Sequence, residues 1–87
     1  MAGGLGNPIA SKKNLTSTDN IDDININGIY SFYAERGLPI NLPSGFDRGC
    51  IIVFNNNVHS VQLIVGLSAV KVRIGGNSVW YSWINIV

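Results

Sequence analysis

The chain from residue 28 onward is a series of short apolar stretches separated by turn-forming residues. The stretches predicted to be strands are residues 28–33, 50–54, 58–65, 70–74 and 79–87. They are rich in β-branched and aromatic residues and are bounded by Gly, Pro or Asn, which is typical of strands joined by turns. The pattern predicts a mainly β fold, built on a small antiparallel sheet of four to five strands.

The alternation of side chains predicts which face of a strand is buried. In residues 70–74 the three aliphatic side chains are predicted to point inward, and Lys71 and Arg73 outward. Residues 50–54 are apolar without interruption, and both faces of that strand are therefore predicted to be covered. Residues 79–87 are predicted to pair with a neighbouring strand, because an unpaired terminus normally frays.

The N-terminal part of the chain has a different character. Residues 1–14 are mostly glycine, alanine and polar residues, and we expect a linker or interdomain joint there, which leaves 15–87 as the domain. One short helical turn is expected over residues 19–24, with Thr18 as its cap, because a threonine hydroxyl can accept a free backbone N–H. Residues 35–49 contain prolines and glycines and are expected to form a long structured loop.

The composition excludes several classes of partner. Charged residues make up only 13% of the chain and the net charge is +1, so no strong field attracts nucleic acid or an anionic surface. No apolar run approaches the ~18 residues that a membrane helix requires. We therefore expect neither a nucleic-acid partner nor insertion into a membrane.

Candidate catalytic residues are few and isolated. His59 and Cys50 are the sole histidine and cysteine, and no motif pairs either of them with an acid or a second metal ligand. Asp22 and Asp23 are adjacent, so their side chains diverge, whereas the carboxylates of a glycosidase face each other. The acidic run also lacks the spacing of a calcium loop. We expect no enzymatic activity, no cofactor and no metal site.

Aromatic residues gather near the end of the chain. In one regular strand Trp80 and Trp83 lie on opposite faces, so we predict that Trp83 is buried and that Trp80 lies nearer an interface or the surface. Exposed aromatic rings stack on sugars or anchor protein interfaces, although plain packing is the competing interpretation. The candidate ligand-binding residues are Trp80, Tyr81, Tyr33 and Asn56.

Five short segments follow one another along the chain: Gly-Ile-Tyr-Ser-Phe at 28–32, Asn-Leu-Pro-Ser-Gly at 41–45, Gly-Cys-Ile-Ile-Val at 49–53, Val-Gln-Leu-Ile at 61–64 and Trp-Tyr-Ser-Trp at 80–83. In this order and spacing they resemble the pyocin knob family, small domains of phage and pyocin tail fibres. The resemblance covers residues 15–87, and the chain departs from the family between Gln62 and Trp80, where Ile-Val-Gly-Leu occupies 64–67.

The resemblance implies a C-terminal module of a phage tail fibre or tail spike, located in the virion. It further implies a homotrimer that takes part in attachment to the host through bacterial surface polysaccharide. Two alternatives stay open. In the first, the chain is a structural knob that caps, spaces or trimerises the fibre without binding ligand. In the second, it is the non-catalytic C-terminal part of a polysaccharide-degrading tail spike.

Overall fold

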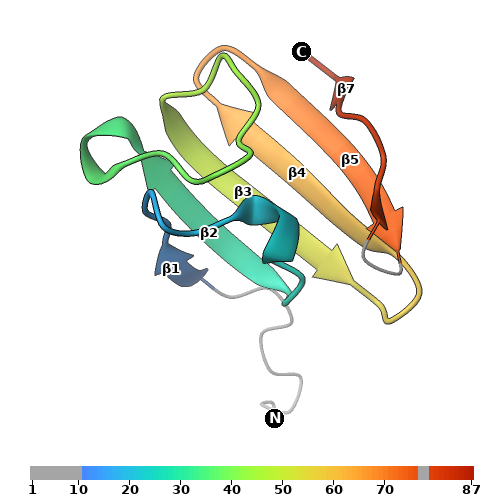
Figure 1. Cartoon of the computed structure of the whole chain (residues 1–87). Coiled ribbons are helices and arrows are strands. Elements are labelled where there is room, and N and C mark those ends of the chain that lie inside the picture. Colours follow the sequence, from blue (N-terminus) through green and yellow to red (C-terminus); the bar gives the residue numbers. More distant parts are fainter. Residues whose placement is uncertain (1–10, 77–78) are drawn as a thin grey trace, which may run out of the picture.

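The computed structural model describes residues 11–76 and 79–87, which form one mainly β domain around a single, mostly antiparallel sheet (Figure 1). The predicted fold class is therefore confirmed. The strands of this part of the chain are β1 Ser11–Asn14, β2 Gly28–Tyr33, β3 Arg48–Asn55, β4 Ser60–Gly66, β5 Val70–Gly76, β6 Val79–Trp80 and β7 Ile84–Asn85. Their order in the sheet is β1-β2-β3-β4-β5-β6, and β7 also pairs with β5.

The four longest strands, β2 to β5, form an antiparallel meander. The turn between β3 and β4 uses asparagine chemistry: Asn57 has a φ of 74°, and the side-chain oxygen of Asn56 accepts hydrogen bonds from the backbone N–H groups of Val58 and His59. Asparagine tolerates this left-handed conformation better than most residues. Local sequence therefore sets the position of this hairpin.

The short elements near the N-terminus differ from the prediction. β1 pairs in parallel with β2 at the edge of the sheet, so residues 11–14 of the expected linker belong to the domain, while residues 1–10 lie outside the described part. The helical turn is a 3₁₀ helix, η1 Ile21–Asp23, and its cap is Asn20, whose side chain accepts from the N–H of Asp22 at 2.9 Å. Thr18 was the wrong cap because the turn begins two residues later than expected. A second 3₁₀ turn, η2, spans Ala34–Arg36.

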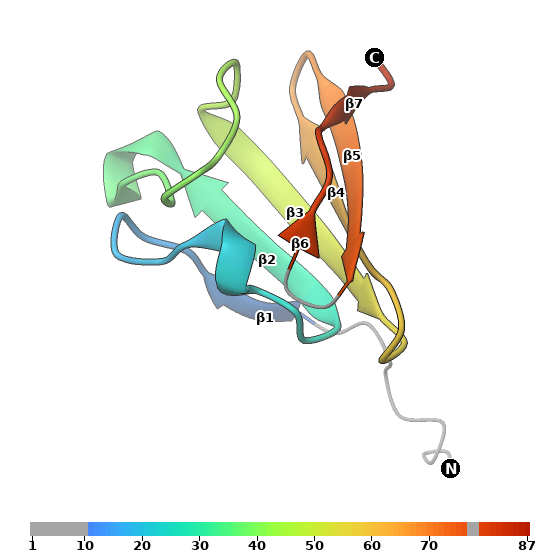
Figure 2. The same cartoon turned by 45° about the vertical axis from the view of Figure 1, so that its right-hand side comes forward.

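One side of the sheet, the inner face, carries the core. Tyr30, Phe32, Ile51, Val53 and Ile64 project from β2, β3 and β4 and are almost fully buried. The segment around η1, the long loop before β3 and the C-terminal segment lie over this face (Figure 2). The buried members of those covering segments are Leu15, Ile21 and Phe46.

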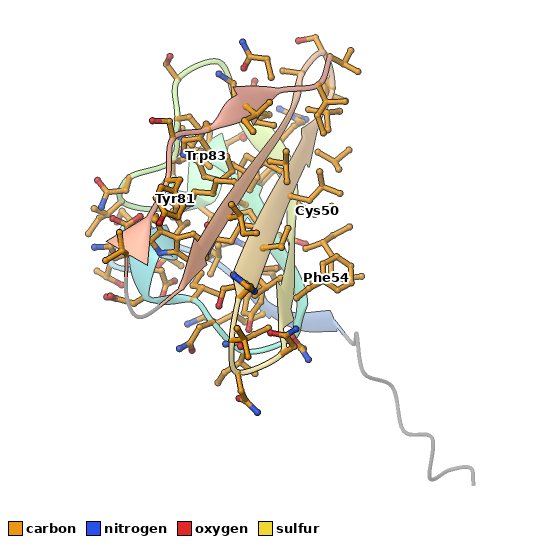
Figure 3. All side chains as sticks on the ribbon, turned by 90° about the vertical axis from the view of Figure 1, so that its right-hand side faces the viewer. Cys50, Phe54, Tyr81 and Trp83 are labelled. Atoms are coloured by element: carbon orange, nitrogen blue, oxygen red, sulfur yellow. The ribbon has the colours of Figure 1, made fainter. Side chains whose placement is uncertain are left out.

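The opposite side, called the outer face below, is apolar and has no segment of residues 11–76 or 79–87 packed over it. Figure 3 shows Cys50 and Phe54 projecting from this side, away from Tyr81 and Trp83. Strand pairing and burial assign to the outer face Ile29, Cys50, Ile52, Phe54, Val61, Leu63, Val65, Val70, Val72 and Ile74.

Two predictions about faces are wrong for this chain. Val70, Val72 and Ile74 lie on the outer face, and it is Arg73 of the same strand that is buried, at 6% exposure. The strand at 50–54 is covered on the inner face alone, and Phe54 remains 43% exposed. The apolar alternation identified the strands but not their buried side. That side is set by segments distant in the sequence, which cover the inner face and supply polar partners for Arg73.

Candidate functional site

A broad, open groove of about 810 Å³ lies at the end of the inner face near the β3–β4 hairpin. Three parts of the chain contribute to it: the η1 segment, the β3–β4 hairpin and the C-terminal segment. The side chains that line it are mostly polar or aromatic, and they include Asp22, Asp23, Asn25, Asn55, Asn57, Arg73, Trp80 and Tyr81.

The buried guanidinium of Arg73 lies between two indole rings at the base of this groove. Its central carbon is 4.3 Å from the ring centroid of Trp80 and 4.4 Å from that of Trp83. Its terminal nitrogen donates to Asp22 at 2.8 Å. Burial lowers the pKa of Arg73, and the hydrogen bond and charge of Asp22 oppose this effect. The arginine remains charged because no ordinary environment deprotonates a guanidinium.

Gln62 connects this arginine to the N-terminal segment. Its side-chain oxygen accepts from Nε of Arg73 at 2.9 Å, and its amide nitrogen donates to the carbonyl oxygens of Ile21 and Ile24 at 2.7 and 3.0 Å. Within the described chain, no buried side-chain nitrogen or oxygen lacks a hydrogen-bond partner. The buried hydrogen-bonding groups of Gln62 and Arg73 thus all have partners, and this lowers the cost of burying the arginine.

An irregularity in the last strand brings the two tryptophans together. Trp80 pairs with Gly75, and Ile84 pairs with Val72. The C-terminal segment therefore holds one residue more than β5 between these pairs, as in a β-bulge. This extra residue reverses the alternation, so the prediction that Trp80 and Trp83 lie on opposite faces is wrong. Both rings are half-buried, Trp83 against the core and Trp80 in the groove.

Trp80 is held in place from two sides. Its indole N–H donates to the carbonyl oxygen of Asp22 at 2.9 Å. The ring also lies close to the backbone of Gly75, where an added Cβ would stand 2.7 Å from a ring carbon. Glycine is therefore required at this position for the indole to reach Arg73.

Several polar groups of the groove are available to a ligand. The carboxylate of Asp23, the amides of Asn25 and Asn57 and the hydroxyl of Tyr81 make no hydrogen bond within the described part of the chain. Tyr81 is 66% exposed. The groove thus combines an aromatic surface with amide groups that both donate and accept hydrogen bonds.

The structure brings together only part of the predicted site. Trp80 and Tyr81 line the groove, whereas the side-chain oxygen of Asn56 is used within its own turn. Tyr33 lies in a separate depression beside Leu15 and Arg36. Arg73 and the η1 carboxylates were missed because their proximity to the aromatic cluster depends on tertiary structure.

Comparison with known proteins leaves the chain without an assigned relative. No family model, no curated protein and no solved structure matches it. Among residues 11–76 and 79–87, no three His, Cys, Asp or Glu side chains lie close enough to hold a metal ion. In the same residues no helix is long and apolar enough to cross a membrane.

Proposed function

We propose that this chain is the attachment module of a phage tail fibre or tail spike, and that its groove binds neutral carbohydrate of the host surface. The observation that carries the binding role is that the exposed Tyr81 and the fixed indole of Trp80 line the same groove as Asn25 and Asn57, whose side-chain amides make no hydrogen bond among the described residues. The fibre context is supported by the sequence resemblance described above.

The chemistry of the groove suits a sugar ring. A pyranose has a C–H face that packs on an aromatic ring, and its hydroxyls both donate and accept hydrogen bonds. The side-chain amides of Asn25 and Asn57 each supply N–H donors and a carbonyl oxygen acceptor. Trp80 is already immobilised by Arg73 and Asp22, so binding against it costs little additional side-chain entropy.

The charges of the groove favour a neutral ligand. Arg73 is buried and its charge is matched by Asp22, so it offers little to an incoming anion. Asp23 is exposed and unpaired among the described residues. An acidic sugar would meet this carboxylate as a like charge, which disfavours uronic and sialic acids.

A structural role is the second candidate, and the bare outer face favours it. In that role the chain caps, spaces or trimerises the fibre, and the groove binds nothing. The resemblance implies a homotrimer in both cases, and we propose this assembly for the chain.

The test compares two exposed tyrosines. Tyr81→Ala removes the ring from the groove, and Tyr33→Ala removes a ring that is 40% exposed outside it. Binding is followed by tryptophan fluorescence, because Trp80 lines the groove, with a panel of neutral and acidic oligosaccharides from bacterial surface polysaccharides. We expect Tyr81→Ala to weaken neutral-sugar binding about tenfold, or ~1.4 kcal/mol, and Tyr33→Ala to leave it unchanged.

Tyr81→Ala should keep the wild-type melting temperature, because Tyr81 is 66% exposed, and Tyr33→Ala should lower it only slightly, because Tyr33 is 40% exposed. Equal losses in the two variants would place the ligand elsewhere. Absence of binding by the wild-type chain to every neutral oligosaccharide would reject carbohydrate binding and leave the structural role.

A further inference from the structure

Two arginines from different elements lie over the ring of Tyr33. Tyr33 ends β2 and pairs with Arg48, the first residue of β3. Arg36 lies in η2, which directly follows β2 and is closed by Gly37 at a φ of 98°. The guanidinium carbons of Arg48 and Arg36 stand 5.4 and 6.0 Å from the centroid of the tyrosine ring. Strand pairing and a short turn thus hold two cations beside one aromatic ring.

Neither arginine has a protein partner for its charge. Both ion pairs of the described residues form elsewhere, at Lys13 and at Arg73. Glu35 and Asp47, the sequence neighbours of the two arginines, are not in those pairs, and residues 1–10 and 77–78 contain no acidic side chain. The two exposed guanidinium groups also make no hydrogen bond within the described chain. Two positive charges beside one ring repel each other, so a shared anion would stabilise this arrangement.

A depression of about 350 Å³ borders the ring, between the end of β1 and η2. Tyr33 and Arg36 line it together with Leu15 and Phe32, whose side chains are buried. Asn14 adds an exposed amide that makes no side-chain hydrogen bond among the described residues. The volume lies near the lower end of the range for ligand sites, about 300–1,000 Å³. The depression is therefore large enough for a small ligand beside the cations.

The guanidinium group is suited to bind an oxyanion. Its planar set of N–H donors matches two oxygens of a carboxylate or a phosphate group. A guanidinium that lies over an aromatic ring is already oriented, so less side-chain entropy is lost when an anion binds to it. Tyr33 remains 40% exposed beside the two cations, which leaves surface for the C–H face of a sugar.

We propose that Tyr33, Arg36 and Arg48 form a second binding site, which takes the carboxylate or phosphate group of an acidic sugar. The site lies at the end of β3 away from the β3–β4 hairpin, whereas the groove lies near that hairpin (Figure 1). The groove and the depression share no residue, so this site does not rest on carbohydrate binding by the groove. A neutral sugar lacks the anion, and Tyr33→Ala therefore remains a control for the groove.

The experiment titrates the isotope-labelled 87-residue chain with small sugars and follows the backbone N–H signals by NMR. The probes are glucuronic acid, glucose-6-phosphate, glucose and inorganic phosphate. We expect both acidic sugars to shift the signals of Tyr33, Arg36 and Arg48, glucose to leave them unchanged, and inorganic phosphate to bind more weakly than glucose-6-phosphate. Tighter binding of glucuronic acid would identify a carboxylate as the preferred anion, and tighter binding of glucose-6-phosphate would identify a phosphate.

Three variants separate the site from the net charge of the chain. Arg36→Gln and Arg48→Gln should each weaken binding of the acidic sugars about tenfold. Lys71→Gln removes the same charge from β5, three strands away from β2, and should leave binding unchanged. Both arginines are exposed, so circular dichroism of their variants should match the wild type, and each variant serves if the other fails to fold.

Four results would overturn the proposal. The first is that neither acidic sugar shifts the signals of Tyr33, Arg36 and Arg48. The second is that the largest shifts fall on Asn57 and Tyr81, which would place the acid in the groove. The third is that Lys71→Gln weakens binding as much as the arginine variants do, which would indicate a response to net charge alone. The fourth is equal affinity for inorganic phosphate and glucose-6-phosphate, because the sugar would then make no contact.

Discussion

Replacing Arg73 by lysine tests whether the planar guanidinium, rather than positive charge alone, holds the C-terminal segment on the sheet. Lysine keeps the charge and can reach a carboxylate such as Asp22. It cannot lie flat between the rings of Trp80 and Trp83 while also donating to Gln62. The substitution therefore separates geometry from charge at one buried position.

The expected cost follows from the contacts that lysine loses. The hydrogen bond to Gln62 is buried and contributes about 1 kcal/mol net. Loss of stacking on two indole faces adds roughly 1 kcal/mol, at the lower end for desolvated cation–π pairs because the ammonium keeps part of the attraction. The ion pair contributes little to the difference, because Asp22 is 39% exposed and its pairing is screened by solvent. The total is about 2 kcal/mol, a large fraction of the ~4–13 kcal/mol expected for 87 residues.

Urea unfolding at one fixed protein concentration measures this loss, with tryptophan fluorescence as the signal. Both tryptophans of the chain flank Arg73, so the emission spectrum of the folded variant should also change. Arg36→Lys is the matched control, because Arg36 is exposed and lies 6.0 Å from the ring of Tyr33. We expect less than ~0.5 kcal/mol for this control. An Arg73→Lys chain as stable as the control, with an unchanged spectrum, would refute the stacked arrangement.

Two other predictions concern the backbone and the pH dependence of stability. Gly49 has a φ of +152° and an added Cβ would overlap the carbonyl oxygen of Val65, so Gly49→Ala should lower the free energy of unfolding by about 2–3 kcal/mol. Gly45 has a φ of +98° with open space around it, so Gly45→Ala should lower it by about 1 kcal/mol in the same urea titration. Equal losses in the two variants would contradict the overlap at Gly49. The N–H of Thr16 donates to Asp19 and holds its pKa below the ordinary 3.8. A lowered pKa means that the carboxylate stabilises the fold above that value and that the stabilisation is lost as the pH falls below it. The wild type should thus exceed Asp19→Asn by about 1 kcal/mol at pH 6, and the difference should vanish in acid; a constant difference would contradict the assignment.

The strands of this fold could be predicted from sequence, but their faces could not. Alternation and turn residues located β2 to β5, because strand period and asparagine turns are local properties. The inward side of β5 was wrong, since a buried arginine requires partners that the local pattern does not reveal. Gln62 and Asp22 are separated from Arg73 by 11 and 51 positions in the sequence, and only the folded chain brings them together.

The candidate site depends on the same long-range arrangement. Trp80 and Tyr81 were predicted as binding residues from their aromatic character, which is visible in sequence. The bulge that places Trp80 and Trp83 on one side could not be predicted, because no residue type in the sequence indicates one extra residue in a short edge strand.

The buried arginine and the bare outer face are two consequences of one choice of register. If the aliphatic residues of β5 pointed to the inner face, the sheet would bury them in a single chain and expose its cations to water. In the observed register Arg73 occupies the inner face of β5, where it packs against Trp80 and Trp83, and Val70, Val72 and Ile74 lie uncovered on the outer face. A one-residue shift would exchange the faces, so the polar partners on the inner face must outweigh that alternative. Association through the outer face would remove the free-energy penalty of exposing Val70, Val72 and Ile74 to water, because these apolar residues would then be buried as well.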